Sequence, residues 1–205
     1  MGLLARLLGR APAADMSNRW LIVGLGNPEQ EYGGTRHNVG ADALNVLAER
    51  LGAAFKPHKA QALVADTWDR PGGAPLSLVR PFGYMNSCGG PVQQALAFYK
   101  ARPERLVVLH DELDLELATV RLKRGGGTAG HNGLKDIQRR ISTPDFFRVR
   151  IGIGRPPGRM TPADYVLKKF SAKELQEAAI ACERAADMVL DLVSEGLEAA
   201  QNRHH

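Results

Sequence analysis

The segment WLIVGLGNPEQEYGGTRHNVGADALNVLAERL, residues 20–51, predicts a strand, a polar turn and a helix. Residues 20–24 form a short, continuous apolar run of the kind that becomes a buried strand. Residues 24–40 then hold five glycines and two asparagines around the single His37, a composition typical of turns. Residues 38–51 repeat apolar side chains at helical spacing. A buried strand that leads through a turn into a helix is typical of α/β proteins.

The same alternation continues along the chain. Further strands are predicted at 76–80, 105–110, 119–123 and 147–154, and further helices at 90–101 and 132–141. Residues 70–75 (RPGGAP) predict a turn between two strands. A last helix follows the capping box of Ser171 and Glu174, and its predicted apolar face comprises Leu175, Ala178, Cys182, Ala185, Val189 and Leu192. We therefore predict a single α/β domain, with a mixed, mostly covered β-sheet and helices on both faces.

The 205 residues suit one domain, which we expect to span residues 19–205. Residues 1–18 are rich in Ala, Leu and Arg and differ from the rest, so we interpret them as an extension that is disordered or that reflects a misassigned start. Met16 is then a candidate for the true start. A targeting presequence is the alternative, although Asp15 and the shortness of the segment argue against it.

The two cysteines indicate neither a disulfide framework nor a zinc site. Cys88 and Cys182 lie far apart, and no Cys or His pattern typical of metal ligands surrounds them. No apolar run approaches the roughly 18 residues that a membrane helix needs. We therefore expect a cytoplasmic protein without membrane association.

Positive charge is concentrated in one stretch. Residues 121–159 carry ten Lys and Arg against two Asp, a net charge of +8 in a chain whose total is +5. Such clustering is typical of a polyanion-binding surface, most often for nucleic acid, although a solvated basic face without a partner is the alternative. Aromatic residues are sparse here, which favours contacts to phosphates over base stacking.

The glycine-rich segment GGGTAGHNG, residues 125–133, formally matches the GxGxxG pattern of dinucleotide sites. It lies mid-chain and not in the first strand-to-helix turn, so the match is weak. The P-loop pattern fails, because His131 and Asn132 stand where Lys and Ser or Thr are required. Two interpretations of the segment remain. It is either a ligand-binding loop, whose glycines expose backbone amides, or a flexible connection between a strand and a helix.

His37 and Asp111 are candidates for an acid–base pair. Asp111 begins the carboxylate-rich end of a predicted buried strand, the place where α/β sheets form their sites. A carboxylate bonded to one imidazole nitrogen orients the ring and stabilises its protonated form. With no activated Ser or Cys nearby, the chemistry that fits is direct attack by water. The alternatives are a structural His37, an Asp111 that caps a turn, and a divalent-cation site.

Four asparagines occupy the predicted turns: Asn27, Asn38, Asn86 and Asn132. An amide can orient a water or polarise a carbonyl without titrating, but asparagine is also a common turn residue. Asn38, at a helix start, is assigned a local structural role. Together the others indicate a polar site built on loops.

Five strings in this order resemble bacterial peptidyl-tRNA hydrolase. They are LIVGLGNPEQEYGGTRHNVG (21–40), PFGYMNSCGG (81–90), VVLHDELDLE (107–116), GGGTAGHNGLKDI (125–137) and FFRVRIGIGRP (146–156). The resemblance extends from about Trp20 to Arg203. It implies hydrolysis of the ester between a peptide and the 3′ ribose of tRNA, which recycles tRNA from aborted translation, with no metal and no cofactor.

The resemblance also implies roles for individual residues. His37 is the general base, Asp111 orients it, and Asn132 positions the water or stabilises the oxyanion. The implied substrate-binding residues are Asn27 and Asn86 near the ester, Met85 on the peptide side, Tyr32 nearby, and Lys123 with Arg150 as a clamp for the 5′ phosphate of tRNA. Peptidyl-tRNA is the expected partner, and the expected state is a monomer with no obligate protein partner.

Two positions depart from the family pattern. Cys88 stands where the family usually has Ser, and Gly83 replaces a larger polar residue, which puts the rigidity of the loop carrying Asn86 in doubt. We expect Cys88 to be a small residue at a helix start and not a nucleophile. The alternative functions are a non-catalytic RNA-binding member of the fold, like those that assist splicing, and a nucleotide-dependent enzyme.

Overall fold

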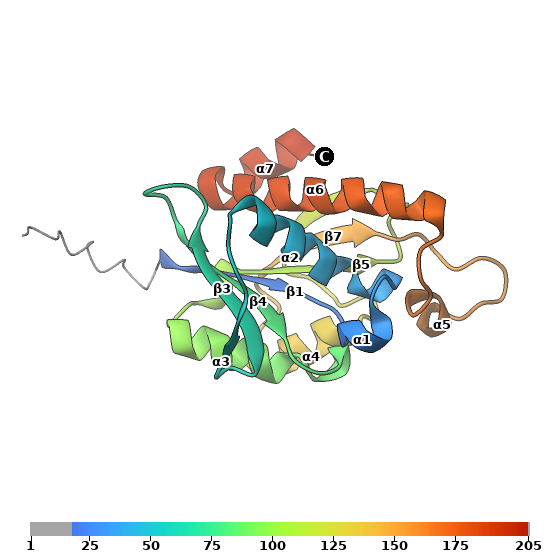
Figure 1. The fold of residues 1–205 in the computed structure, drawn as a ribbon, viewed down its shortest axis with the longest axis horizontal. Coiled ribbons are helices and arrows are strands. Elements are labelled where there is room, and N and C mark those ends of the chain that lie inside the picture. Colours follow the sequence, from blue (N-terminus) through green and yellow to red (C-terminus); the bar gives the residue numbers. More distant parts are fainter. Residues whose placement is uncertain (1–17, 205) are drawn as a thin grey trace, which may run out of the picture.

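The computed structural model describes residues 18–204, which form a seven-stranded β-sheet with helices on both faces (Figure 1). The strands lie in the order β2-β3-β4-β1-β5-β7-β6. They are β1 (Trp20–Gly24), β2 (Lys56–His58), β3 (Ala62–Trp68), β4 (Pro75–Pro81), β5 (Leu106–Glu112), β6 (Val120–Arg124) and β7 (Phe147–Gly152). Neighbours among β4, β1, β5 and β7 are parallel, whereas the pairs β2–β3, β3–β4 and β6–β7 are antiparallel. The predicted mixed α/β sheet is confirmed.

Helices of very different length lie between the strands and after the last of them. They are α1 (Glu29–Tyr32), α2 (Val39–Arg50), α3 (Gly89–Tyr99), α4 (Asn132–Ile141), α5 (Pro162–Val166), α6 (Ala172–Glu195) and α7 (Leu197–His204). Short 3₁₀ turns are η2 (Arg36–Asn38), η3 (Met85–Ser87) and η4 (Pro103–Arg105). Among residues 18–204, no helix is both long and apolar enough to span a bilayer.

The sheet separates two hydrophobic cores. Helices α2, α6 and α7 cover one face, and α3 and α4 cover the other (Figure 1). Side chains alternate along β1, so Ile22 enters the first core while Leu21 and Val23 enter the second. Burial on both faces explains why β1 and the first four residues of β5, 106–109, are continuously apolar.

The structure shifts several predicted boundaries. Residues 105–110 were predicted as a strand, but β5 continues to Glu112, and β6 and β7 are each displaced or shortened by one or two residues. The predicted turn at 70–75 joins β3 to β4, although no range was predicted for β3, and β2 was not predicted. It has three residues, including Pro57, and lies at the sheet edge, where no periodic pattern is needed.

The helix after Ser171 forms as predicted, with both halves of its capping box and a buried Cys182. The assignment of Leu175 to its buried face was wrong, because this side chain is 49% exposed. Figure 1 shows that the first turns of α6 extend past the end of β7, so the sheet does not cover them. The predicted extension at 1–18 lies outside the described residues, apart from Asn18.

Candidate active site

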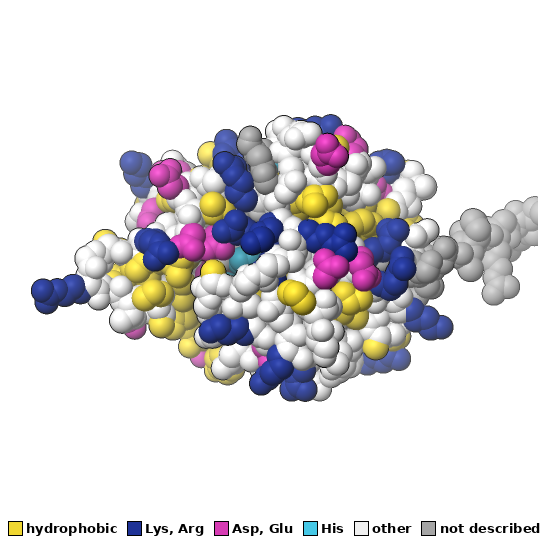
Figure 2. All heavy atoms as spheres, turned by 180° about the vertical axis from the view of Figure 1, so that it is seen from behind, with side chains coloured by type: hydrophobic (Ala, Val, Ile, Leu, Met, Phe, Trp, Pro, Cys, Tyr) yellow, Lys and Arg dark blue, Asp and Glu magenta, His cyan; other side chains and the backbone are white. Residues whose placement is uncertain are grey.

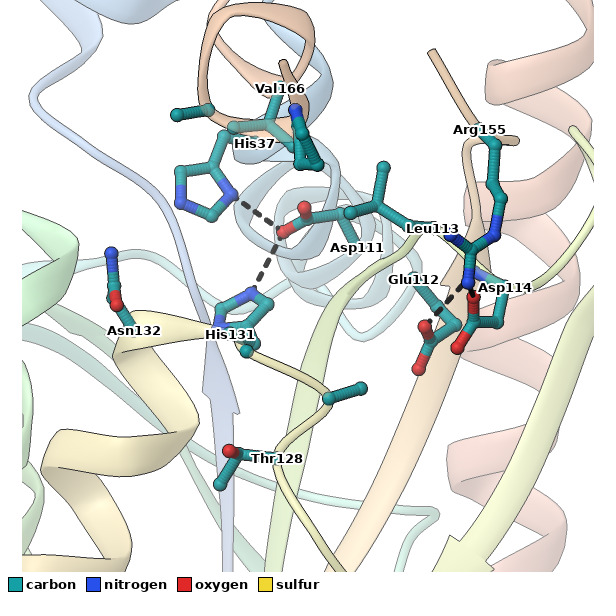
Figure 3. A pocket seen from close by; sticks show the side chains of 14 residues that line it. His37, Asp111, Glu112, Leu113, Asp114, Thr128, His131, Asn132, Arg155 and Val166 are labelled. Atoms are coloured by element: carbon teal, nitrogen blue, oxygen red, sulfur yellow. Dashed lines mark hydrogen bonds and ion pairs between the residues drawn. The ribbon is translucent and has the colours of Figure 1, made fainter.

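His37, Asp111 and His131 meet where the parallel strands end (Figure 3). His37 lies in η2, Asp111 near the end of β5, and His131 directly before α4. A cavity of about 430 Å³ opens beside them, bordered by the 128–132 loop, the residues after β5 and helix α5. Three of the predicted site residues, His37, Asp111 and Asn132, line this cavity.

Gly40 allows His37 to lie close to Asp111. It is in the first turn of α2, which packs directly on β5. A Cβ at this position would lie 2.3 Å from the Leu109 carbonyl oxygen, a distance that no side chain tolerates. The amide of Ala41 also donates to the Leu25 carbonyl at 2.9 Å. The absence of a side chain at residue 40 therefore sets the separation between the helix that follows His37 and the strand that carries Asp111.

The His37–Asp111 pair has the geometry that the sequence predicted. His37 Nδ1 lies 2.9 Å from Asp111 Oδ1, and the two side chains are 12% and 2% exposed. Burial alone would lower the pKa of His37, but the charge and hydrogen bond of Asp111 outweigh it and raise this pKa above its ordinary value. Burial likewise opposes ionisation of Asp111, yet the two histidines hold its pKa well below the usual range. Asp111 is therefore ionised although it is buried.

His131 is the site residue that the sequence did not identify as functional. Its Nε2 lies 2.9 Å from the same Asp111 oxygen, and its Nδ1 accepts from the Leu134 amide at 3.3 Å, which caps α4. Because Nδ1 accepts, the proton of the neutral ring is on Nε2 and is donated to Asp111. The neighbouring His110 stays neutral, since burial and then His131 lower its pKa to about 3.

Two of the asparagines are joined through the backbone. Asn27 Oδ1 accepts from the Met85 amide at 2.8 Å, which ties the turn after β1 to η3. The Asn38 side chain, 1% exposed, accepts from the Asn27 amide and donates to the Asn27 carbonyl, at 2.9 and 3.1 Å. Asn38 therefore does not cap its own helix but holds Asn27 in place, a structural role of longer range than predicted.

The predicted peptide-side residues form a separate group outside the lining of the cavity. Met85 is buried, while Asn86, the next residue of η3, is exposed. The ring of Tyr32 meets that of exposed Tyr84 edge-to-face, with centroids 6.3 Å apart. The site thus has a cavity lined by His37 and, outside that lining, an exposed surface that carries Tyr84 and Asn86.

Residues 121–159 carry a net charge of +8, but some of their basic side chains are already paired with carboxylates of this chain. Register places Lys123 opposite Arg148 and Arg121 opposite Arg150, so these four side chains share the sheet face that α4 covers in part. Arg150 was predicted as a phosphate ligand, but its Nε bonds to Glu112 Oε2 at 3.0 Å. Within residues 18–204, Lys123 is exposed and has no ion pair. Figure 2 shows Lys and Arg side chains bordering the visible histidine.

The glycine-rich segment connects β6 to α4, and the side chain of Arg148 binds two of its backbone carbonyls. This arginine is 2% exposed and donates to the carbonyls of Gly126 and Gly127, at 2.7 and 2.5 Å. His131 already occupies one of the amides at the start of α4, that of Leu134, which would otherwise be open to a phosphate. The geometry therefore gives no support to the nucleotide-dependent alternative.

One donor atom from each of His37, Asp111 and His131 lies within 4.8 Å of the others, a spacing that can also hold a metal ion. As arranged, these atoms bond to one another and form an acid–base group. Our expectation of metal-free chemistry stays a prediction.

The sequence profile of the family described as peptidyl-tRNA hydrolase matches residues 21–205. The chain belongs to the peptidyl-tRNA hydrolase family. The peptidyl-tRNA hydrolase of Frankia casuarinae is 53% identical over 91% of this chain and 93% of that protein. The one from Pseudarthrobacter chlorophenolicus is 51% identical, over 93% and 97%. The crystal structure of Acinetobacter baumannii peptidyl-tRNA hydrolase matches with a TM-score of 0.84 and 39% identity, covering 93% of this chain and 96% of that one.

The two departures from the peptidyl-tRNA hydrolase pattern lie on either side of η3. Gly83 has a φ of +81°, which favours glycine in this turn. Cys88 precedes α3, is 2% exposed and places its Sγ 3.6 Å from the Gly133 carbonyl. Burial, followed by the nearby Asp136, raises the pKa of this thiol to about 12. The buried thiol agrees with the prediction from the sequence that Cys88 is not a nucleophile.

Proposed function

We propose that this protein hydrolyses the ester that joins a peptide to the 3′ ribose of tRNA, with water as the nucleophile. The observation that carries the proposal is the buried His37–Asp111 pair beside a cavity of about 430 Å³. Cavities of this size accept a nucleoside-sized group. The family membership supports the same reaction, as does the shared fold.

In the proposed reaction, His37 transfers the proton twice. Its Nδ1–H is bonded to Asp111, which leaves Nε2 to accept a proton from water as the water oxygen attacks the ester carbonyl. Asp111 stabilises the imidazolium that results. When the tetrahedral intermediate breaks the bond to the ribose oxygen, the imidazolium returns the proton to that oxygen. The products are a tRNA with a free 3′ hydroxyl and a peptide carboxylic acid, which releases its proton to the solvent and becomes a carboxylate.

The asparagines supply hydrogen bonds around the ester. Asn132 lines the cavity at the start of α4 and is exposed, so its amide is free to orient the water or the developing oxyanion. Asn27 and Asn86 align the substrate on the other side of His37. Met85 and Tyr32 contribute to the surface that receives the peptide.

Lys123 and Arg150 are proposed to bind the 5′ phosphate of tRNA. Both lie on one face of the β6–β7 pair, two residues apart in register. Glu112 holds Arg150 through Nε, which leaves the two terminal guanidinium nitrogens available for a phosphate. Lys123, which is exposed and has no ion pair within residues 18–204, adds a further positive charge nearby. The basic stretch is then explained as a tRNA surface.

We further propose that the protein acts as a cytoplasmic monomer. A single chain brings His37, Asp111 and His131 into hydrogen-bond contact, so the proposed acid–base group needs no residue from a second copy. The substrate is a product of translation, which takes place in the cytoplasm of bacteria.

The test is to incubate the purified protein with an N-blocked aminoacyl-tRNA and to follow both ester cleavage and tRNA binding. Cleavage by the wild type, with loss of cleavage and retained binding in His37→Ala, is expected. Binding without cleavage by the wild type would contradict the proposal and favour the RNA-binding alternative.

A further inference from the structure

Arg36, the residue before His37, is buried in a cage of aromatic side chains. It is 6% exposed, and its guanidinium lies over the rings of Tyr165 and Phe170, 4.4 and 5.1 Å from their centroids. Stacking on two rings stabilises an arginine and fixes the plane of its guanidinium. Burial of a charged arginine costs free energy unless the charge is paired. A residue that only filled space at this position would therefore be apolar.

The guanidinium also binds the chain that leads into α6. Its Nη1 donates to the carbonyls of Lys168 and Lys169, at 3.1 and 3.0 Å, and its Nη2 bonds to Glu174 Oε1 at 2.6 Å. Lysine cannot reproduce this set, because it presents one point charge and no planar fork. The side chain therefore joins residue 36 to a segment more than 130 positions later.

Backbone hydrogen bonds reinforce the same connection. The Arg36 amide donates to the Lys168 carbonyl at 3.1 Å, and the Phe170 amide donates to the Gly34 carbonyl at 3.2 Å. The segment that carries His37 and the segment after α5 thus form a short two-stranded bridge, centred on Thr35 and Lys169.

Both ends of this connection reach the cavity. His37 lines it on one side, and Pro162, Ala163 and Val166 of α5 line it on another. Tyr165, the ring on which Arg36 stacks, donates its hydroxyl to the Ile153 carbonyl at 2.8 Å and so fixes α5 over the end of β7. Arg36 is therefore placed to set the position of the base relative to α5, whose Val166 lies beside His37 in Figure 3.

We infer that Arg36 is a positioning residue, which acts through His37 and α5 to hold the general base at its working distance from the bound ester. The inference rests on the proposed function. It assigns to Arg36 no contact with the substrate, since its guanidinium is enclosed by protein. Displacement of a catalytic group by about 1 Å can cost about 10²-fold in rate, so the cage is expected to influence kcat.

The experiment compares Arg36→Met and Arg36→Lys with Arg50→Met. Arg50 is the control because, like Arg36, it pairs with carboxylates of α6, here Glu183 and Asp187, but it lies at the end of α2 and does not border the cavity. With N-blocked aminoacyl-tRNA we expect Arg36→Met to lower kcat at least about 10-fold, with tRNA affinity nearly unchanged. We expect Arg36→Lys to recover part of that loss and Arg50→Met to keep the wild-type kcat.

A second pair of variants decides the matter if Arg36→Met does not fold. Glu174→Gln weakens the partner of Arg36, whereas Ser171→Ala removes a capping hydrogen bond of the same helix without touching Arg36. We expect Glu174→Gln to lower kcat several-fold and Ser171→Ala to lower only the melting temperature. Wild-type kcat in a folded Arg36→Met or in Glu174→Gln would overturn the inference, as would an equal loss in the control variants.

The wild type and His37→Ala are measured in the same assay. If the wild type does not cleave the ester, the proposed function fails. If it cleaves and His37→Ala does not, while the Arg36 variants match the wild type, only the positioning role of Arg36 is disproved.

Discussion

His37 Nδ1 lies 2.9 Å from Asp111 Oδ1, although the two residues are separated by 74 positions and come from different elements. The distance follows from the parallel pairing of β1 with β5 and from the close packing of α2 on β5 at Gly40. The hydrogen bond commits one imidazole nitrogen and leaves the other for the substrate.

Replacement of His37 by alanine removes the proposed general base. We expect kcat to fall by at least about 10²-fold, with little change in tRNA affinity, because the imidazole handles the proton and not the RNA. Single-turnover cleavage and equilibrium binding to tRNA measure the two quantities separately. Full activity in His37→Ala would show that another group activates the water.

Replacement of Asp111 by asparagine keeps the shape of the side chain but removes its charge. We expect a folded protein with kcat reduced at least about 10²-fold, since the imidazolium formed during the reaction loses its stabilising partner. Circular dichroism checks the fold, and kcat is measured with saturating substrate. Unchanged kcat would instead indicate that Asp111 is a structural residue.

The pH dependence of kcat/KM should report the pKa of His37. The base acts in its neutral form, so activity rises as pH increases through that pKa, which Asp111 raises. Without the negative charge in Asp111→Asn the pKa falls, and the remaining activity should rise at a lower pH than in the wild type. If the midpoint pH of the profile does not move, or moves upward, the pH dependence does not arise from the His37–Asp111 pair.

Lys123→Ala should weaken binding to tRNA and make it less sensitive to salt. If Lys123 neutralises one phosphate, the slope of log K against log salt decreases by about 0.7 to 0.9. The matched control is Lys56→Ala, because Lys56 is also exposed but lies in β2, at the opposite edge of the sheet from β6. Equal slopes for both variants would move the phosphate contact elsewhere.

Gly40→Ala should destabilise the protein and impair catalysis together. The added methyl group collides with the Leu109 carbonyl, and such overpacking typically costs about 1–3 kcal/mol. Gly90→Ala in α3 is the control, because no atom lies within 4 Å of its added Cβ and alanine favours helices. Thermal unfolding and kcat are measured for both. A stable, fully active Gly40→Ala would show that α2 can move away from β5 without consequence.

Removal of metal ions should leave the activity unchanged, because an imidazole activates the water in the proposed reaction. The enzyme alone is treated with a chelator and desalted, and then assayed in the usual magnesium buffer so that the tRNA keeps its fold. Loss of activity, restored by one divalent cation, would assign His37, Asp111 and His131 to a metal site.

The sequence predicted those features that depend on short local patterns. A polar turn after an apolar run marked His37, and a carboxylate at the end of a buried strand marked Asp111. His131 was missed because its role depends on the β5–β7–β6 order, which brings the start of α4 to Asp111. The partner of Arg150 was missed for the same reason, since Glu112 is its neighbour only across the β5–β7 pair.

The caged position of Arg36 limits how related sequences can diverge. A smaller residue at 165 or 170 would open a gap beside a buried charge, and a neutral residue at 174 would leave that charge without its carboxylate. A change at any of these positions is therefore tolerated best together with a compensating change at residue 36. We expect positions 36, 165, 170 and 174 to covary among homologues, so that a homologue has either all four residues of the cage or none of them.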